Sequence, residues 1–168
     1  LTAIYTHDSG SILYKGQPVH FQNAMQARAA GIAIIHQEFN LFPNLTVAEN
    51  IFLGDKSVQA HGFVNWNAMY RRAQELVDSI GGTFSVQEKV QALSVQNQQV
   101  VEIVKALAAN AEVLIMDEPT SALPESEVQH LFRTIRGLKA RGVAIVYVSH
   151  RLNEIFEICD DITVLRDG

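Results

Sequence analysis

Residues 113–123 read VLIMDEPTSAL, an apolar run that ends in two adjacent carboxylates. Four apolar residues without polar alternation predict a strand buried on both faces, as in a parallel sheet. Asp117 and Glu118 follow this strand directly, and parallel sheets bind ligands at the carboxyl ends of their strands. Carboxylates there cost desolvation free energy unless a partner compensates them, and Mg²⁺ is the obvious partner.

The segments on either side alternate between strand and helix patterns. Apolar runs at 32–35 and 143–148 predict two more buried strands, and a one-sided apolar pattern over 125–140 predicts a helix. This alternation predicts an α/β fold with a parallel sheet and right-handed crossovers. The other expected elements are strands at 11–14, 19–21 and 162–165 and helices at 24–30, 68–80 (capped by Asn67), 94–110 and 152–159.

Polar residues follow each of the three buried strands. Gln37 follows the strand at 32–35, and His150 follows the strand at 143–148. Because the carboxyl ends of parallel strands share one edge, we expect these side chains beside Asp117 and Glu118. Simpler interpretations exist for three of these residues. Asp117 and Glu118 are also compatible with a solvated strand end, and His150 with a structural role.

Composition limits the classes of protein that remain. The chain has 168 residues, of which 48% are hydrophobic and 18% charged, enough for one domain with a packed core. Its net charge of -5 disfavours a nucleic-acid role. One cysteine, Cys159, excludes an intrachain disulfide and favours a reducing compartment. The sequence contains neither a bilayer-spanning apolar run nor a signal-peptide pattern at its start.

The run 113–123 resembles the Walker B strand and D-loop of ABC ATPases. Gln37 resembles the Q-loop glutamine and His150 the H-loop histidine, while LSVQNQQ at 93–99 lies where the LSGGQ signature belongs. Residues 36–54, HQEFNLFPNLTVAENIFLG, resemble the monosaccharide-import branch (ribose, galactose or xylose type), whose ATPases carry two fused cassettes. The chain is most similar to the first cassette of such a pair.

The resemblance implies a P-loop NTPase-like parallel core, an α-helical subdomain inserted at about 38–110 and remnants of an antiparallel β subdomain. The phosphate loop, GxxxxGKS or GxxxxGKT, does not occur in residues 1–168. We expect it upstream of Leu1, because residues 1–5 resemble the tail of a helix. The chain is therefore expected to be a partial ATP-binding domain that is inactive and poorly soluble alone.

The resemblance also implies a role for each site residue. Asp117, with Gln37, would hold Mg²⁺, and Glu118 would be the general base that orients the attacking water. Gln37 would also be catalytic, sensing Mg²⁺ or that water, and His150 would contact the γ-phosphate of ATP. The expected nucleotide-binding positions are Ser94, Gln96, Asp117 and Ser121. Ser94 is equally well explained as a helix cap. Gln96 stands where the family has a small residue, which weakens the expectation of full activity at a partner's site.

The implied function is that of the ATP-hydrolysing subunit of a bacterial ABC importer for simple sugars, peripheral to the cytoplasmic side of the inner membrane. Its implied partners are a second cassette (fused or homodimeric), transmembrane permease subunits and, indirectly, a periplasmic sugar-binding protein; no nucleic acid is expected. Two alternatives remain: a degenerate cassette that completes a partner's ATP site without hydrolysis, and a soluble ABC ATPase of translation or DNA repair.

Overall fold

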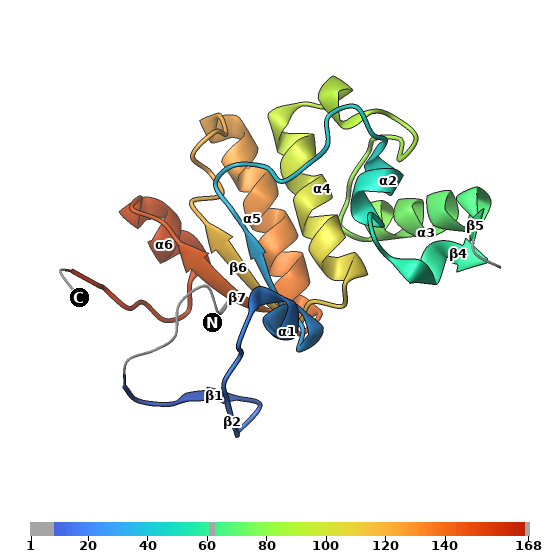
Figure 1. Ribbon diagram of the computed structural model, residues 1–168. Coiled ribbons are helices and arrows are strands. Elements are labelled where there is room, and N and C mark those ends of the chain that lie inside the picture. Colours follow the sequence, from blue (N-terminus) through green and yellow to red (C-terminus); the bar gives the residue numbers. More distant parts are fainter. Residues whose placement is uncertain (1–8, 61–62, 167–168) are drawn as a thin grey trace.

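A parallel three-stranded sheet forms the centre of the computed structural model, which describes residues 9–60 and 63–166. The strands are β3 (Ile32–Ile35), β6 (Val113–Asp117) and β7 (Ala144–Val148), in the order β3-β6-β7. Ile35 lies opposite Met116, and Asp117 lies opposite Val148. This register brings the carboxyl ends of the three strands to one edge, as the alternation of strand and helix predicted (Figure 1).

One face of this sheet is covered by helices. α5 (Glu125–Ala140) begins directly after Pro124 and has the bounds predicted from its apolar spacing. It packs against the sheet together with α4 (Val95–Ala108). The core between them contains Ile103, Leu114, Met116, Phe132 and Leu138, each no more than 1% exposed. A buried aliphatic or aromatic side chain contributes about 1.5–3 kcal/mol of transfer free energy, so this layer is a main source of the domain's stability.

A second core lies on the other side of α4. It is built from α2 (Val47–Ile51), α3 (Trp66–Ser79) and the short 3-10 helices η1 (Lys56–Val58) and η2 (Val90–Ala92). Thr46 begins α2 with a capping box, because its side chain and that of Glu49 each bond the other residue's backbone amide. α4 contributes Val101 and Val104 to this core and Ile103 to the sheet core, so it connects the two parts.

Short elements complete the described chain. β1 (Ile12–Tyr14) and β2 (Gln17–Val19) form an antiparallel hairpin, followed by α1 (Ala24–Ala29). Lys15 and Gly16 both have positive φ, as a two-residue hairpin turn requires. A second small hairpin joins β4 (Gln59–Ala60) to β5 (Phe63–Val64), and α6 (Leu152–Ile158) follows β7.

The structure corrects the expectation that the sheet strands are buried on both faces. Burial alternates along β7, where Val146 and Val148 are 40% and 45% exposed while Ile145 and Tyr147 pack into the core. The reason is that α4 and α5 cover one face of the sheet only, and β7 is an edge strand of the described sheet.

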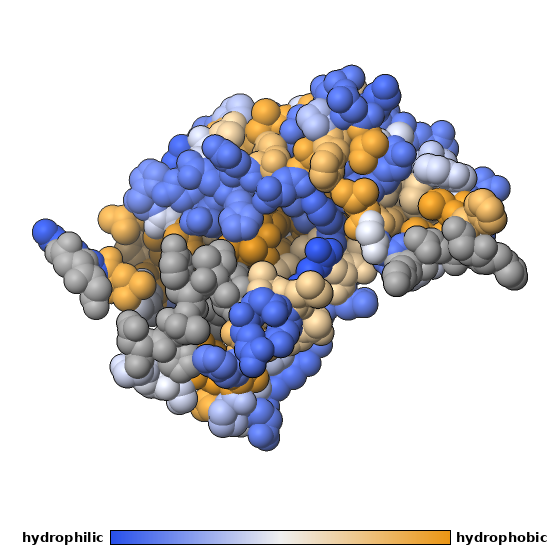
Figure 2. Space-filling view, in the orientation of Figure 1, coloured by the Kyte–Doolittle hydropathy of each residue, from blue (hydrophilic) through white to orange (hydrophobic). Residues whose placement is uncertain are grey.

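Two further expectations need correction. Residues 162–165 form no strand, since none of the described strands lies beside them to accept hydrogen bonds, and Val164 and Leu165 are 83% and 85% exposed. They add to the apolar surface beside the C-terminal end at the left of Figure 2. The cap of α3 is Asn65, whose side chain accepts from the amide of Ala68, and not Asn67, which lies inside the helix.

Smaller differences concern element ends. The second strand of the first hairpin is at 17–19 instead of 19–21, because the tight turn at Lys15 pairs Tyr14 with Gln17. The predicted helical character of residues 1–5 lies outside the described residues. Of the helices in the described ranges, none combines the length and the apolarity that crossing a membrane requires.

Candidate functional site

The carboxyl end of β6 carries an unusual backbone conformation. Asp117 is the last residue of the strand, and Glu118 follows it with φ 46°. Positive φ is uncommon outside glycine and costs roughly 1–2 kcal/mol for most residues. The Glu118 amide nonetheless stays tied to the sheet, because it donates to the Val148 carbonyl at 2.9 Å. Backbone strain of this kind is concentrated at functional sites, which makes Glu118 a candidate on geometry alone.

Glu118 contacts the histidine that follows the neighbouring strand. Its Oε1 lies 2.9 Å from Nδ1 of His150, 32 positions later in the sequence. The His150 side chain is 73% exposed and that of Glu118 32% exposed. The pair is therefore positioned by the sheet yet open to solvent on one side, as a site that receives a ligand needs to be.

The chain then makes a tight turn before α5. The Ser121 amide donates to the Glu118 carbonyl at 3.0 Å, and the Leu123 amide donates to the Thr120 carbonyl at 3.1 Å. Ser121 is exposed at the tip of this turn, while Thr120 is buried beneath it. The turn thus ties the backbone of Ser121 to that of Glu118 and leaves the Ser121 side chain exposed.

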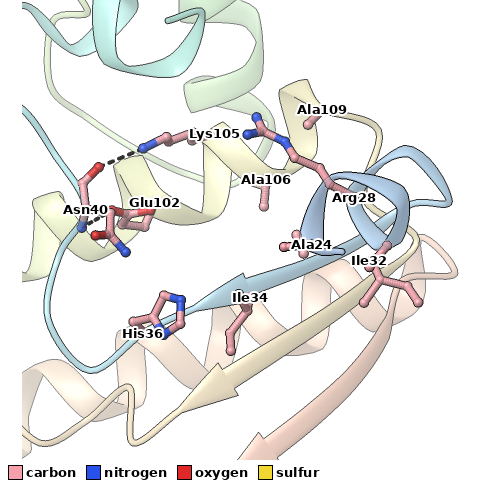
Figure 3. A pocket seen from close by; sticks show the side chains of 12 residues that line it. Ala24, Arg28, Ile32, Ile34, His36, Asn40, Glu102, Lys105, Ala106 and Ala109 are labelled. Carbon is pink, nitrogen blue, oxygen red and sulfur yellow. Dashed lines mark hydrogen bonds between the residues drawn. The ribbon is translucent and has the colours of Figure 1, made fainter. Parts of the chain in front are cut away.

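Gln37 lies two residues beyond β3 and is exposed. The chain after it is held against α4: the Asn40 amide donates to Glu102 Oε1 and Lys105 Nζ donates to the Asn40 carbonyl, both at 2.7 Å. Figure 3 shows both bonds at the side of a pocket of about 230 Å³ that Arg28 also lines. Gln37 is therefore on a loop whose far end is clamped, while its own side chain is presented to solvent.

Ser94 and Gln96 are not brought to this cluster. Ser94 is the N-cap of α4, with its Oγ accepting from the Asn97 amide at 3.2 Å, as its capping interpretation requires. Gln96 is half-buried in the first turn. Within the described part of the chain, neither makes a hydrogen bond or ion pair with Asp117, Glu118 or His150.

One polar centre beneath the site was not predicted from the sequence. Glu154, on α6, is 6% exposed and accepts hydrogen bonds from Thr120, Tyr147 and Ser149. Burial, together with the Glu154 hydrogen bond, raises the pKa of Tyr147, so its phenol stays protonated and donates. The available signal was weak: Tyr147 and Ser149 are two residues apart, so they point to one face of the strand.

The parallel sheet, the covering helices and the polar residues at the strand ends define an α/β protein with the P-loop NTPase type of fold. Residues 1–121 match the family model described as "ABC transporter". The chain belongs to this family.

Solved structures share the fold. The ATP-binding cassette MJ1267, solved in its ADP conformation, aligns with a TM-score of 0.77 at 20% identity, over 95% of this chain and 66% of that one. The protein cbiO1 from Clostridium perfringens, part of the ABC transporter complex cbiONQ, aligns with a TM-score of 0.79 at 22% identity, over 95% and 63%.

A third similar structure is the ATP-binding cassette MJ0796, dimeric in a post-hydrolysis state bound to ADP and Pi. It aligns with a TM-score of 0.69 at 24% identity, over 91% of this chain and 68% of that one. The present chain thus spans about two thirds of the length of these structures.

Proposed function

We propose that this chain is part of the ATP-hydrolysing subunit of a bacterial ABC importer for simple sugars. The observation that carries the hydrolytic part is the 2.9 Å contact between Glu118 and His150 at the carboxyl end of the parallel sheet, next to Asp117. Family membership supports nucleotide binding in general. The sugar-import part rests on the sequence similarity of residues 36–54.

The donor set fits a magnesium-bound nucleotide. In the described residues no three histidine, cysteine or acidic side chains gather into a metal site. Mg²⁺ does not require such a cage, since it is usually held by one or two carboxylates together with substrate phosphates and water. Asp117 would supply that carboxylate, and Gln37 an amide oxygen. The ion would supply charge neutralisation at the phosphates.

Glu118 and His150 have complementary tasks in this proposal. A general base must lie within hydrogen-bond reach of the water that it activates, and the partial exposure of the Glu118 carboxylate supports this role. His150 would donate to the γ-phosphate and hold Glu118 in place through Nδ1. Phosphoryl transfer depends mostly on positioning and on stabilising charge, which these two groups provide.

α4 supports a role toward a second cassette. A helix N-terminus presents free amides and partial positive charge, which favours binding of phosphate. Ser94 caps this terminus, and Gln96 follows in the first turn. Because neither contacts the Glu118–His150 pair, we propose that they serve the ATP site of a second cassette, while Ser121 faces the cassette interface.

The remaining proposals concern the membrane. The surface formed by residues 37–54 would bind two transmembrane permease subunits, and a periplasmic sugar-binding protein would deliver the substrate to them. The subunit would be peripheral to the cytoplasmic side of the bacterial inner membrane. No nucleic acid enters this proposal.

The decisive test is Glu118→Gln in the complete natural protein that contains these residues, assembled with its membrane subunits. The amide keeps the shape of the side chain but removes its basicity, so turnover of ATP should fall about 10²- to 10⁴-fold. Glu125→Gln, an exposed change in the first turn of α5, is the matched control and should keep turnover within twofold. A fall of less than threefold for Glu118→Gln would contradict the assignment.

A transport assay tests the substrate class and the non-hydrolysing alternative together. Uptake of labelled ribose, xylose and galactose is measured in cells that carry the wild type or Glu118→Gln. Loss of uptake of one sugar with Glu118→Gln supports the proposal. If Glu118→Gln leaves uptake unchanged while Ser94→Arg abolishes it, the chain instead completes a partner's site, and Gln96 at the position of a small residue would favour that result.

A further inference from the structure

Glu154 is a buried carboxylate that gathers hydrogen bonds from two separate strand ends. Its Oε2 accepts from Thr120 Oγ1 at 2.8 Å, from the Tyr147 hydroxyl at 2.9 Å and from Ser149 Oγ at 3.2 Å. Its Oε1 pairs with Arg151 at 3.1 Å. Burying a carboxylate costs several kcal/mol unless its oxygens are satisfied, and here four donors satisfy them.

The donors flank the residues of the candidate site. Thr120 lies two residues after Glu118 and directly before Ser121. Ser149 directly precedes His150, and its Oγ also accepts from the Arg151 amide at 3.0 Å. The one carboxylate on α6 therefore joins the turn after β6 to the segment after β7.

This arrangement matters because the site has little other support at this point. The His150 side chain is 73% exposed, and its contact with Glu118 spans the gap between the two strand ends. The position of its ring therefore depends on the backbone of its neighbours. Of these, Ser149 and Arg151 are both bonded to Glu154.

We propose that Glu154 is a positioning residue of the nucleotide site, which holds the Thr120–Ser121 turn and the His150 segment in the register that lets Glu118 meet His150. The inference rests on the proposed function, in which Glu118 and His150 act on ATP. Glu154 itself touches no reacting atom and acts through Thr120, Ser149 and Arg151.

The first experiment uses Glu154→Gln in the complete natural protein assembled with its membrane subunits. Glutamine keeps the volume of the side chain but replaces one carboxylate oxygen by an NH2 donor, so the contact of one oxygen with Arg151 and the contacts of the other oxygen with the three hydroxyls can no longer both be kept. We expect kcat for ATP to fall about 10- to 100-fold with KM within about threefold, the pattern of lost positioning in the transition state. Glu157→Gln, one turn further along α6 and exposed, is the matched control and should leave kcat within twofold.

Amide hydrogen exchange separates positioning from general stability. Glu154→Gln should accelerate exchange in residues 118–123 and 149–151 at least tenfold while leaving α3 unchanged, and Glu157→Gln should change neither. If exchange accelerates throughout the chain and kcat per folded molecule stays at the wild-type value, Glu154 is only structural and the inference is wrong.

A milder pair of variants covers the case in which Glu154→Gln does not fold. Thr120→Val and Ser149→Ala each remove one donor and should lower kcat three- to tenfold each. If Glu154→Gln folds, adding Thr120→Val to it should lower kcat by less than Thr120→Val does in the wild type. The two residues form one contact, so their effects on kcat should not add. Wild-type kcat in both single variants would overturn the inference.

The outcomes also separate this inference from the proposed function. If Glu118→Gln abolishes turnover while Glu154→Gln keeps it, only the positioning role fails. If the wild-type protein hydrolyses no ATP, the proposed function fails, and the role of Glu154 fails with it.

Discussion

Asn50 should hold the loop after Gln37 in place, and its removal should loosen that loop. The side chain is 1% exposed on α2. Its Oδ1 accepts from the Phe42 amide at 2.7 Å, and its Nδ2 donates to the carbonyls of Phe42 and Thr46, each at 3.0 Å. The Phe42 and Thr46 carbonyls also accept backbone amides, at 3.2 and 3.0 Å, so the Phe42 amide is the group that depends most on Asn50.

The magnitude follows from these three bonds. A buried hydrogen bond contributes about 0.5–1.5 kcal/mol net, and a polar group left without a partner costs about 1–3 kcal/mol. Asn50→Ala should therefore raise the free energy of the local closed state by about 2–4 kcal/mol, or about 30- to 1000-fold in the opening equilibrium constant. Asn50→Asp should cost at least as much, because a carboxylate would face the Phe42 and Thr46 carbonyl oxygens.

The assay is amide hydrogen exchange by mass spectrometry on peptides that cover residues 40–46 of the complete natural protein. Asn44→Ala, an exposed change in the same loop, is the control and should leave the exchange of Phe42 within threefold of wild type. Unchanged exchange in Asn50→Ala, with an unchanged thermal midpoint, would refute the reasoning. It would mean that Glu102 and Lys105 hold the loop without help from α2.

Three further outcomes are expected. Asn65→Ala should destabilise α3 by about 0.5–2 kcal/mol while Asn67→Ala changes stability by less than about 0.5 kcal/mol, measured as shifts of the urea midpoint; equal shifts would contradict the assigned cap. Gly82→Ala should destabilise the chain by about 1–3 kcal/mol, because the added Cβ would lie 2.5 Å from Val77 Cγ1 and 3.2 Å from the Val77 carbonyl oxygen. A urea midpoint equal to that of the wild type would show that the backbone around Gly82 shifts to accommodate the methyl group. Burial raises the pKa of the Cys159 thiol, so iodoacetamide at pH 8 should alkylate the folded protein more slowly than the urea-unfolded protein; equal rates would argue against this shift.

Local signals were sufficient where one segment carried its own pattern. The helix at 125–140 begins after Pro124 and shows apolar residues at helical spacing, so its bounds were predicted correctly. The three strands of the parallel sheet were predicted from apolar runs, and their order of appearance predicted parallel pairing. For the helix, neighbours in the sequence supply the determining interactions. For the sheet, the alternation of strands with helices indicated parallel pairing, although Ile32 pairs with the distant Val113.

Local signals failed where two neighbours were equally suitable. Asn65 and Asn67 are both good capping residues, and only the structure shows that the helix begins after Asn65, whose amide donates to the Val58 carbonyl. Residues 162–165 have strand composition, yet a strand also needs a hydrogen-bonding neighbour, and the described strands offer none there.

At the candidate site, too, some features follow from local sequence and others depend on tertiary contacts. The sequence by itself determined the fold class and which residues stand at the strand ends, because a strand followed by polar residues is a local pattern that can be read directly. Only the tertiary structure decided that Glu118 meets His150, since that contact depends on the register that places Asp117 opposite Val148. It alone also revealed Glu154, because a buried carboxylate finds its donors across 34 positions, and the distance between such groups is set by the packing of α6 against the sheet.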